Sequence, residues 1–165
     1  MLPKIVVPDP GADRELPGPG ESRLSVLAPN TNGARCAILG LSLMPTLLIV
    51  DDHEGLRRFA RALLGAEGFD VIGEAADGEA ALAAVQALHP EVVLLDIQLP
   101  GIDGFEVAER LAGSPDAPCL VLMSSRQASD YGARMAESPA CGFLPKHELS
   151  GAAVAALVAR GSRGV

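Results

Sequence analysis

The sequence predicts an α/β fold, a doubly wound (βα)5 arrangement in which five parallel strands alternate with five helices. After residue 44, short apolar runs alternate with segments of helical periodicity. Apolar runs without polar alternation are typical of parallel strands that helices cover on both faces of the sheet. The expected strands are Leu47–Val50, Phe69–Glu74, Val92–Leu95, Leu120–Met123 and Gly142–Leu144.

Three helices are indicated clearly by apolar residues that recur every three or four positions. The first follows the first strand directly. The second begins at Asp77-Gly78 and ends before Pro90, and the third runs from about Asp103 to Leu111. The residues expected to face inward are Leu56, Phe59, Ala60, Leu63 and Leu64 in the first helix, Leu82, Val85 and Leu88 in the second, and Phe105, Ala108 and Leu111 in the third.

The fourth helix, near Gln127–Glu137, is predicted to be weak because Gly132 interrupts it, which leaves Tyr131 and Met135 as its anchors. Poor helix propensity and sparse packing lower the free energy of local opening, so this segment suits a mobile element. The fifth helix is expected from Leu149 to about Ala159. Its inward residues would be Val154, Leu157 and Val158.

Residues 1–44 contain six Pro and five Gly and show no apolar periodicity. Such a segment cannot bury enough surface to offset its ordering entropy, so we expect it to be disordered and to precede a domain over 45–165. Met44 stands directly before the first strand. The preceding residues are therefore either an upstream extension, with the true start codon at Met44, or a real flexible tail.

Charge and composition limit the classes of function. With 21 acidic and 13 basic residues, the net charge of -8 argues against a nucleic-acid surface, because no basic stripe is present to neutralise phosphates. No signal pattern is found, and the longest uncharged run is too short to span a membrane. The cysteines Cys36, Cys119 and Cys141 are interpreted as small core residues in a reducing, cytoplasmic compartment.

Polar side chains follow four of the predicted strands. They are Asp51 and Asp52 after the first strand, Asp96 after the third, Ser124 after the fourth and Lys146 after the fifth. With the strand order 2-1-3-4-5, the ends of these strands lie side by side, and three carboxylates converge on one pocket. Such a cluster is costly unless a hard divalent cation, Mg²⁺ or Mn²⁺, neutralises it.

Carboxylates, a cation, a hydroxyl and an ammonium group together suit a phosphoryl group. Its transition state spreads negative charge over three oxygens, which the metal, Ser124 and Lys146 can meet separately. Asp96 is the best-placed nucleophile because it ends the central strand. An alternative for Asp52 is the N-cap of the following helix, and Ser125 competes with Ser124 for the hydroxyl role.

The sequence here resembles the response-regulator receiver domains of two-component signalling, which have a flavodoxin-like fold. The resemblance covers about residues 45–160 and rests on "VDD", "LLDIQLPGIDG", "LMSS" and "GFLPK" at matching positions. The spacings of 28 residues from Asp96 to Ser124 and 22 from Ser124 to Lys146 are typical of the family. Pro145 precedes Lys146, whereas many receivers place a cis-proline after the lysine.

The resemblance implies a phosphorelay signalling protein that accepts a phosphoryl group on Asp96 from a sensor histidine kinase or phosphotransfer protein. Asp52 would bind Mg²⁺ directly, Asp51 through water, and Gln98 through its backbone carbonyl. Ser124 would move toward the phosphoryl group, and the aromatic Phe143 would turn inward with it. Output would pass through the fourth helix, fifth strand and fifth helix to an unknown downstream protein, and phosphorylation could produce a homodimer.

The chain looks like a stand-alone receiver, without a DNA-binding domain or a membrane anchor, and like a phospho-acceptor switch rather than a turnover enzyme. One alternative is a pseudo-receiver, which would bind partners without phosphorylation. Another is a metal-dependent phosphatase or phosphotransferase with an Asp nucleophile. Haloacid-dehalogenase-like enzymes of that kind carry a second catalytic Asp two residues after the nucleophile, where this chain has Gln98.

Overall fold

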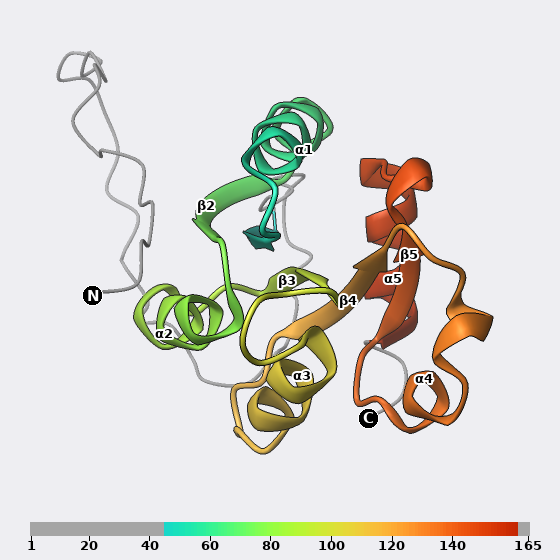
Figure 1. Ribbon diagram of the computed structural model, residues 1–165. Helices are drawn as coiled ribbons and strands as arrows, with labels where there is room; N and C mark the ends of the chain where they lie inside the picture. Colours follow the sequence, from blue (N-terminus) through green and yellow to red (C-terminus); the bar gives the residue numbers. More distant parts are fainter. Residues whose placement is uncertain (1–44, 162–165) are drawn as a thin grey trace, which may run out of the picture. The chain divides into compact units, whose positions relative to one another are not determined.

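A computed structural model of the protein describes residues 45–161, so the expectations for residues 1–44 and for Cys36 lie outside the described residues. Its centre is a parallel five-stranded sheet in the order β2-β1-β3-β4-β5, which confirms the predicted order (Figure 1). The strands are β1 (Thr46–Val50), β2 (Asp70–Ala75), β3 (Val92–Asp96), β4 (Cys119–Ser124) and β5 (Gly142–Pro145).

Helices cover both faces of the sheet. They are α1 (Glu54–Ala66), α2 (Gly78–Leu88), α3 (Gly104–Ala112), α4 (Ala133–Glu137) and α5 (Gly151–Gly161). α1 and α5 pack on one face through residues such as Leu64 and Val154. α2 and α3 pack on the other face through residues such as Ala84 and Phe105, and Met135 of α4 joins them (Figure 1). The inner strands β1, β3 and β4 are therefore buried from both sides, as their apolar sequences predict, whereas the edge strands β2 and β5 are less completely buried.

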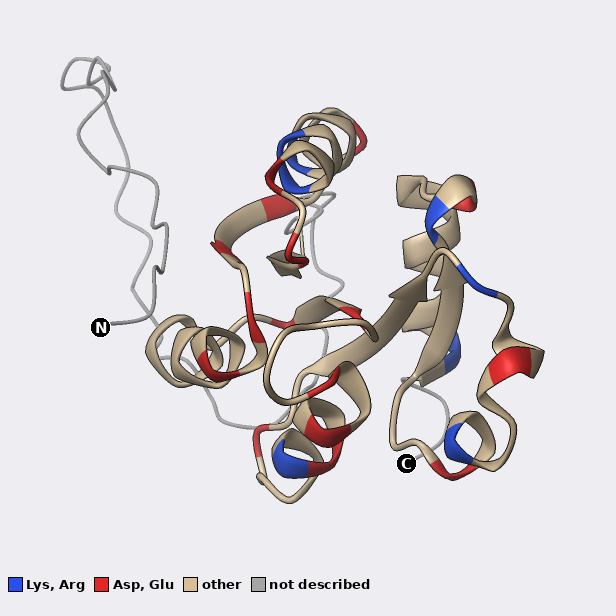
Figure 2. Cartoon of the chain, in the orientation of Figure 1, with Lys and Arg blue, Asp and Glu red and all other residues tan. Residues whose placement is uncertain are grey.

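The strand register brings the carboxyl ends of the strands together. Val50 lies opposite Leu95, so Asp51 and Asp96 follow at the same level of β1 and β3. Ser124 pairs with Pro145 at the ends of β4 and β5, which places Lys146 directly beyond the sheet. The charge-coloured cartoon shows acidic segments after β1 and β3 and a basic segment after β5 (Figure 2).

The observed helix caps show whether Asp52 is the N-cap of the first helix, an alternative that the sequence left open. Asp77 accepts a hydrogen bond from the backbone N–H of Ala80 and so caps α2. α1 is preceded instead by His53, and no side chain caps it. Asp52 is therefore not the cap of α1, and its carboxylate is available for another role.

The segment 127–137, expected to form a weak fourth helix, forms two short helices instead. A four-residue 3-10 helix, Ala128–Tyr131, is separated from α4 by Gly132 at φ +52. Neither short helix contains a fully buried residue. Tyr131 and Met135 are half-buried against the core, as expected for its anchors.

The expectation that Phe59 faces inward is wrong. Its side chain is 56% exposed, whereas Ala60 and Leu64 are completely buried. The buried stripe of α1 is centred on Ala60 and Leu64, and successive helical residues are about 100° apart, so Phe59 lies at its edge. It lines a hollow beside Lys146 instead of the core.

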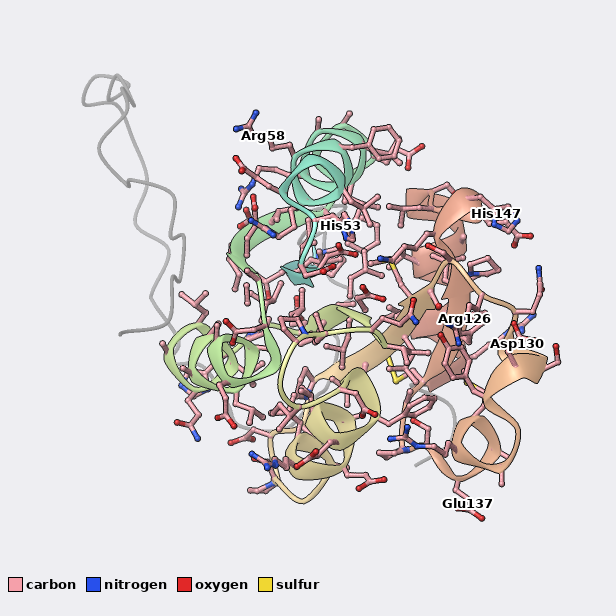
Figure 3. The ribbon with its side chains drawn as sticks, in the orientation of Figure 1. His53, Arg58, Arg126, Asp130, Glu137 and His147 are labelled. Atoms are coloured by element: carbon pink, nitrogen blue, oxygen red, sulfur yellow. A yellow bond between two sulfur atoms is a disulfide. The ribbon has the colours of Figure 1, made fainter. Side chains whose placement is uncertain are left out.

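The interpretation of Cys119 and Cys141 as small core residues in a reducing compartment is also corrected, because the structure pairs them. The two residues are joined by a disulfide, with 5.8 Å between their Cα atoms (Figure 3). The backbone N–H of Cys141 donates to Leu120 at the start of the β4–β5 pairing, so the register places the cysteines on neighbouring strands. The cysteines therefore no longer argue for a reducing compartment. Among the described residues, no helix is long and apolar enough to cross a bilayer.

Candidate phosphoryl-acceptor site

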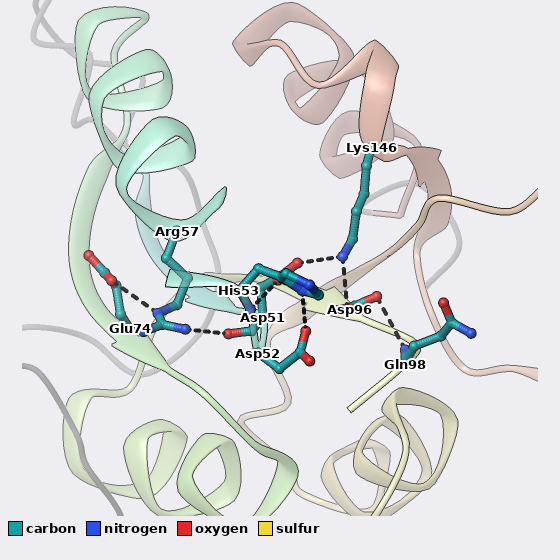
Figure 4. A network of polar contacts seen from close by, with 8 residues as sticks. All are labelled: Asp51, Asp52, His53, Arg57, Glu74, Asp96, Gln98 and Lys146. Atoms are coloured by element: carbon teal, nitrogen blue, oxygen red, sulfur yellow. Dashed lines mark hydrogen bonds and ion pairs between the residues drawn. The ribbon is translucent and has the colours of Figure 1, made fainter. Parts of the chain in front are cut away.

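Two buried carboxylates share one ammonium group at the carboxyl edge of the sheet. Nζ of Lys146 lies 2.9 Å from Oδ2 of Asp96 and 2.7 Å from Oδ2 of Asp51 (Figure 4). Asp51 is completely buried and Asp96 is 2% exposed. The structure thus brings together three of the residues predicted from the strand ends. Asp51 and Asp96 are 45 positions apart along the chain, and Asp96 and Lys146 are 50 positions apart.

Burial and charge act in opposite directions on the pKa values of this site. Burial raises the pKa of Asp96 above its ordinary value, although the hydrogen bond and charge of Lys146 oppose the rise. Burial alone would lower the pKa of Lys146, but its interactions with Asp51 and Asp96 outweigh burial and raise it. Lys146 therefore stays charged at neutral pH, and it stabilises the ionised carboxylates around it.

Asp52 lies beside this pair and is more exposed. Its Oδ1 is 2.6 Å from Nδ1 of His53, whose backbone N–H donates to Oδ1 of Asp51 at 2.9 Å. Asp51, Asp52 and His53 offer ligand atoms within 4.8 Å of one another. His53, for which a ligand role is disfavoured because hard cations prefer oxygen, is thus close to the predicted metal-binding carboxylates.

A second network holds the backbone at the end of β1. The guanidinium of Arg57, on α1, donates to the carbonyl of Asp51 at 2.7 Å and to Glu74 at 3.3 Å (Figure 4). Glu74 lies on β2 and is also paired with Arg61. A guanidinium offers five donors in a fixed geometry, so Arg57 ties α1, β1 and β2 together at the acidic pair. The sequence reasoning missed this role; the signal for it was a charged residue, Glu74, at the buried end of β2.

The carboxylate of Asp96 also accepts a hydrogen bond from the backbone. The N–H of Gln98 donates to Oδ1 of Asp96 at 3.2 Å, which places the Gln98 peptide next to this carboxylate. The segment continues into α3, whose first residue, Gly104, donates its N–H to the carbonyl of Ile97. The Asp96 carboxylate is therefore held by the β3–α3 connection on one side and by Lys146 on the other.

Ser124 is completely buried at the end of β4, and its hydroxyl faces a tyrosine. Its Oγ lies 2.6 Å from the hydroxyl of Tyr131 and accepts the N–H of Arg126 at 3.0 Å. Phe143 is half-buried against the same core, with its ring centroid 6.5 Å from that of Tyr131. The sequence identified Tyr131 only as a packing anchor. Its place seven residues after Ser124 on a broken helix gave no signal of this hydrogen bond.

The residues fit a divalent cation. Asp51, Asp52 and Asp96 place three carboxylates against one ammonium, and the buried Oδ2 of Asp51 meets that ammonium at 2.7 Å. Buried carboxylates in excess of the cations around them are costly, and a hard cation with oxygen ligands would neutralise them. Asp51, Asp52, Asp96 and the Gln98 carbonyl are the groups that could hold it.

An open hollow of about 730 Å³ lies beside the site. His53, Leu56 and Phe59 line it from the α1 side, and Lys146 and His147 line it from the β5–α5 side. The stick view shows His53 and His147 on these two elements (Figure 3). Among the described residues, Phe59 is the large hydrophobic side chain that stands exposed, and it stands at this hollow.

Comparison with known proteins agrees with this geometry. Residues 47–157 match the family model of the response regulator receiver domain, so the chain belongs to that family, whose members act in two-component systems. It is 34% identical over 104 residues to the response regulator GacA of Pseudomonas aeruginosa, covering 62% of this chain and 49% of that protein. It is 30% identical over 112 residues to the DNA-binding transcriptional activator EvgA of Escherichia coli, covering 68% of this chain and 55% of that protein.

The chain spans about half the length of the curated relatives it matches. Solved structures show the same fold. A two-component response regulator of the LuxR family from an Aurantimonas species superposes with a TM-score of 0.64 at 27% identity, over 70% of this chain and 86% of that chain. The chemotaxis response regulator CheY4 of Vibrio cholerae gives a TM-score of 0.61 at 24% identity, over 72% and 98%. The chain therefore has the flavodoxin-like receiver fold.

Proposed function

We propose that the protein is a phospho-acceptor switch that takes a phosphoryl group on Asp96 in a Mg²⁺-dependent reaction. The observation that carries this proposal is the Lys146 ammonium held between Asp51 and Asp96 at the carboxyl edge of the sheet. A nucleophilic carboxylate and a fixed positive charge are what an in-line phosphoryl transfer requires of a protein.

In the transfer, an oxygen of Asp96 attacks the phosphorus of a phosphohistidine on the donor protein. The P–N bond breaks as the P–O bond forms, and the departing imidazole of the donor takes up a proton. Mg²⁺, held by Asp51, Asp52, Asp96 and the Gln98 carbonyl, would neutralise charge on the phosphoryl oxygens. Lys146 stabilises a further oxygen, and Ser124 would donate to the third.

The donor is a sensor histidine kinase or a phosphotransfer protein. The hollow between α1 and the β5–α5 connection supports an approach from this side, because Lys146 forms part of its wall and exposed Phe59 offers an apolar contact. The acceptor step occurs once per activation, so the protein is a signalling module and not a turnover enzyme. Output would follow α4, β5 and α5 to a downstream protein or to a second copy of the chain, in the cytoplasm.

Intact-protein mass after incubation with Mg²⁺ and acetyl phosphate tests the proposal. We expect one added phosphoryl group on the wild type and none on Asp96→Asn, which keeps the size of the side chain but removes the nucleophile. Chelation of Mg²⁺ should abolish the addition. Equal labelling of both proteins would show that Asp96 is not the acceptor. No labelling of either, with acetyl phosphate and with histidine kinases, would favour a pseudo-receiver.

A further inference from the structure

The single hydrogen bond between Ser124 and Tyr131 joins the proposed acceptor site to a segment with sparse packing, 128–137. Ser124 ends β4 and is fully buried, whereas Tyr131 ends the 3-10 helix Ala128–Tyr131, which has no fully buried residue. Gly132, at φ +52, separates Tyr131 from α4. Movement of the Ser124 hydroxyl therefore changes or breaks its hydrogen bond with Tyr131.

The hydroxyl of Ser124 makes two hydrogen bonds in this structure. It accepts the N–H of Arg126 at 3.0 Å and lies 2.6 Å from the hydroxyl of Tyr131. A serine hydroxyl has one proton to donate. A Ser124 that turns to donate to a phosphoryl oxygen on Asp96 must give up the position in which it contacts Tyr131.

Other contacts of Tyr131 fix where its hydroxyl lies. Its ring meets Phe105 of α3 edge-on, with 5.5 Å between centroids, and Phe143 of β5 at 6.5 Å. Arg134 lies over the face of Phe105 at 4.5 Å and pairs with Asp103. The tyrosine ring is thus held by packing that does not depend on the hydroxyl. Phe143, the aromatic residue on β5, has no hydroxyl with which to take over the bond.

We propose that Tyr131 is a positioning residue that restrains Ser124 before phosphorylation. Its hydroxyl holds the Ser124 side chain in the unphosphorylated orientation, so engagement of Ser124 with the phosphoryl group breaks this bond and releases the segment 128–137. The proposal rests on the proposed function, since it requires a phosphoryl group at Asp96. It names the contact that couples that site to α4.

The affinity of the metal-loaded protein for beryllofluoride, an analogue of the aspartyl phosphate, tests the restraint. Tyr131→Phe keeps the ring packing and removes the hydroxyl. Because one hydrogen bond no longer has to be broken, beryllofluoride should bind roughly three- to tenfold more tightly to this variant than to wild type. Ser129→Ala, which removes an exposed hydroxyl from the same 3-10 helix, is the matched control and should bind as wild type does.

The same substitution in a Ser124→Ala background separates restraint from packing. With no Ser124 hydroxyl to hold, Tyr131→Phe should leave the affinity unchanged. An unchanged or weaker affinity of the single variant, or an equal gain in both backgrounds, would overturn the role of Tyr131 while wild-type binding upholds the acceptor site. If wild type and all variants failed to bind beryllofluoride in the presence of Mg²⁺, the proposed function would fall, and this proposal with it.

Discussion

At the scale of single residues, the site is governed by the balance between burial and charge around Lys146. Its ammonium lies within 3 Å of two carboxylates that solvent scarcely reaches, at 2.9 Å from Asp96 and 2.7 Å from Asp51. Even so, burial dominates at Asp96 and raises its pKa. The ionised form of Asp96 is therefore less favourable in the folded protein than in the unfolded chain, and a bound cation would reduce this cost.

This balance predicts a pH-dependent effect of Asp96→Asn on stability. A group whose pKa is raised by folding favours the folded state below its unfolded pKa of about 3.9, and this contribution is lost as the pH rises through the folded pKa. With metal chelated, Asp96→Asn should therefore raise the free energy of unfolding at neutral pH, by on the order of 1 kcal/mol. The gain should shrink as the pH falls toward 4.

Urea unfolding at several pH values, in the presence of a chelator, measures this gain. Saturating Mg²⁺ should reduce or reverse it, because the cation binds the folded wild type more tightly than the variant. A gain independent of pH would mean that the charge of Asp96 is not its cause.

At the scale of elements, Asp96 is held in place by close contact between β3 and α3. A Cβ on Gly104, the first residue of α3, would overlap the carbonyl oxygen of Asp96 and lie 2.8 Å from Cα of Ile97. Only a residue without a side chain allows the helix to begin this close to the strand. The position of Asp96 thus depends on a glycine that has no side chain to contribute to the site.

Gly104→Ala should therefore lower the free energy of unfolding by about 2 kcal/mol, because the backbone around Asp96 and Ile97 must shift. It should also slow phosphorylation by acetyl phosphate. Gly65→Ala in α1 is the matched control, since no atom lies within 4 Å of the new Cβ, and there we expect a gain of about 0.5–1 kcal/mol. Chemical denaturation and labelling rates of both variants give the comparison. Equal stabilities for the two would show that the β3–α3 contact can relax.

At the scale of the whole molecule, the described residues contain both apolar clusters and every residue of the site. We predict that a chain shortened to begin at Met44 takes up the same single phosphoryl group, at the same rate, and unfolds at the same temperature as the full chain. Mass spectrometry and calorimetry on the two chains measure this. Loss of labelling or a lower unfolding temperature would show that residues 1–43 contribute to the domain.

Features that follow from the alternation of strands and helices, and from the residues at the strand ends, could be predicted from the sequence. Features that depend on the conformation of a loop or on the exact strand register could not. The sheet order and the meeting of Asp51, Asp96 and Lys146 follow once the strands are parallel. The pairing of Cys119 with Cys141 depends on which residues of β4 and β5 are neighbours, which the pattern leaves open. The Ser124–Tyr131 bond depends on the path of the chain from the end of β4 through the 3-10 helix Ala128–Tyr131, and no periodicity encodes it.

Tyr131 also provides the protein with an intrinsic fluorescence probe. The chain has one tyrosine and no tryptophan, so its intrinsic ultraviolet fluorescence comes from this single ring. The phenol is hydrogen-bonded to the residue proposed to move on phosphorylation. Emission from the unlabelled protein would therefore follow the switching event itself in a stopped-flow instrument, without an attached dye or an engineered reporter.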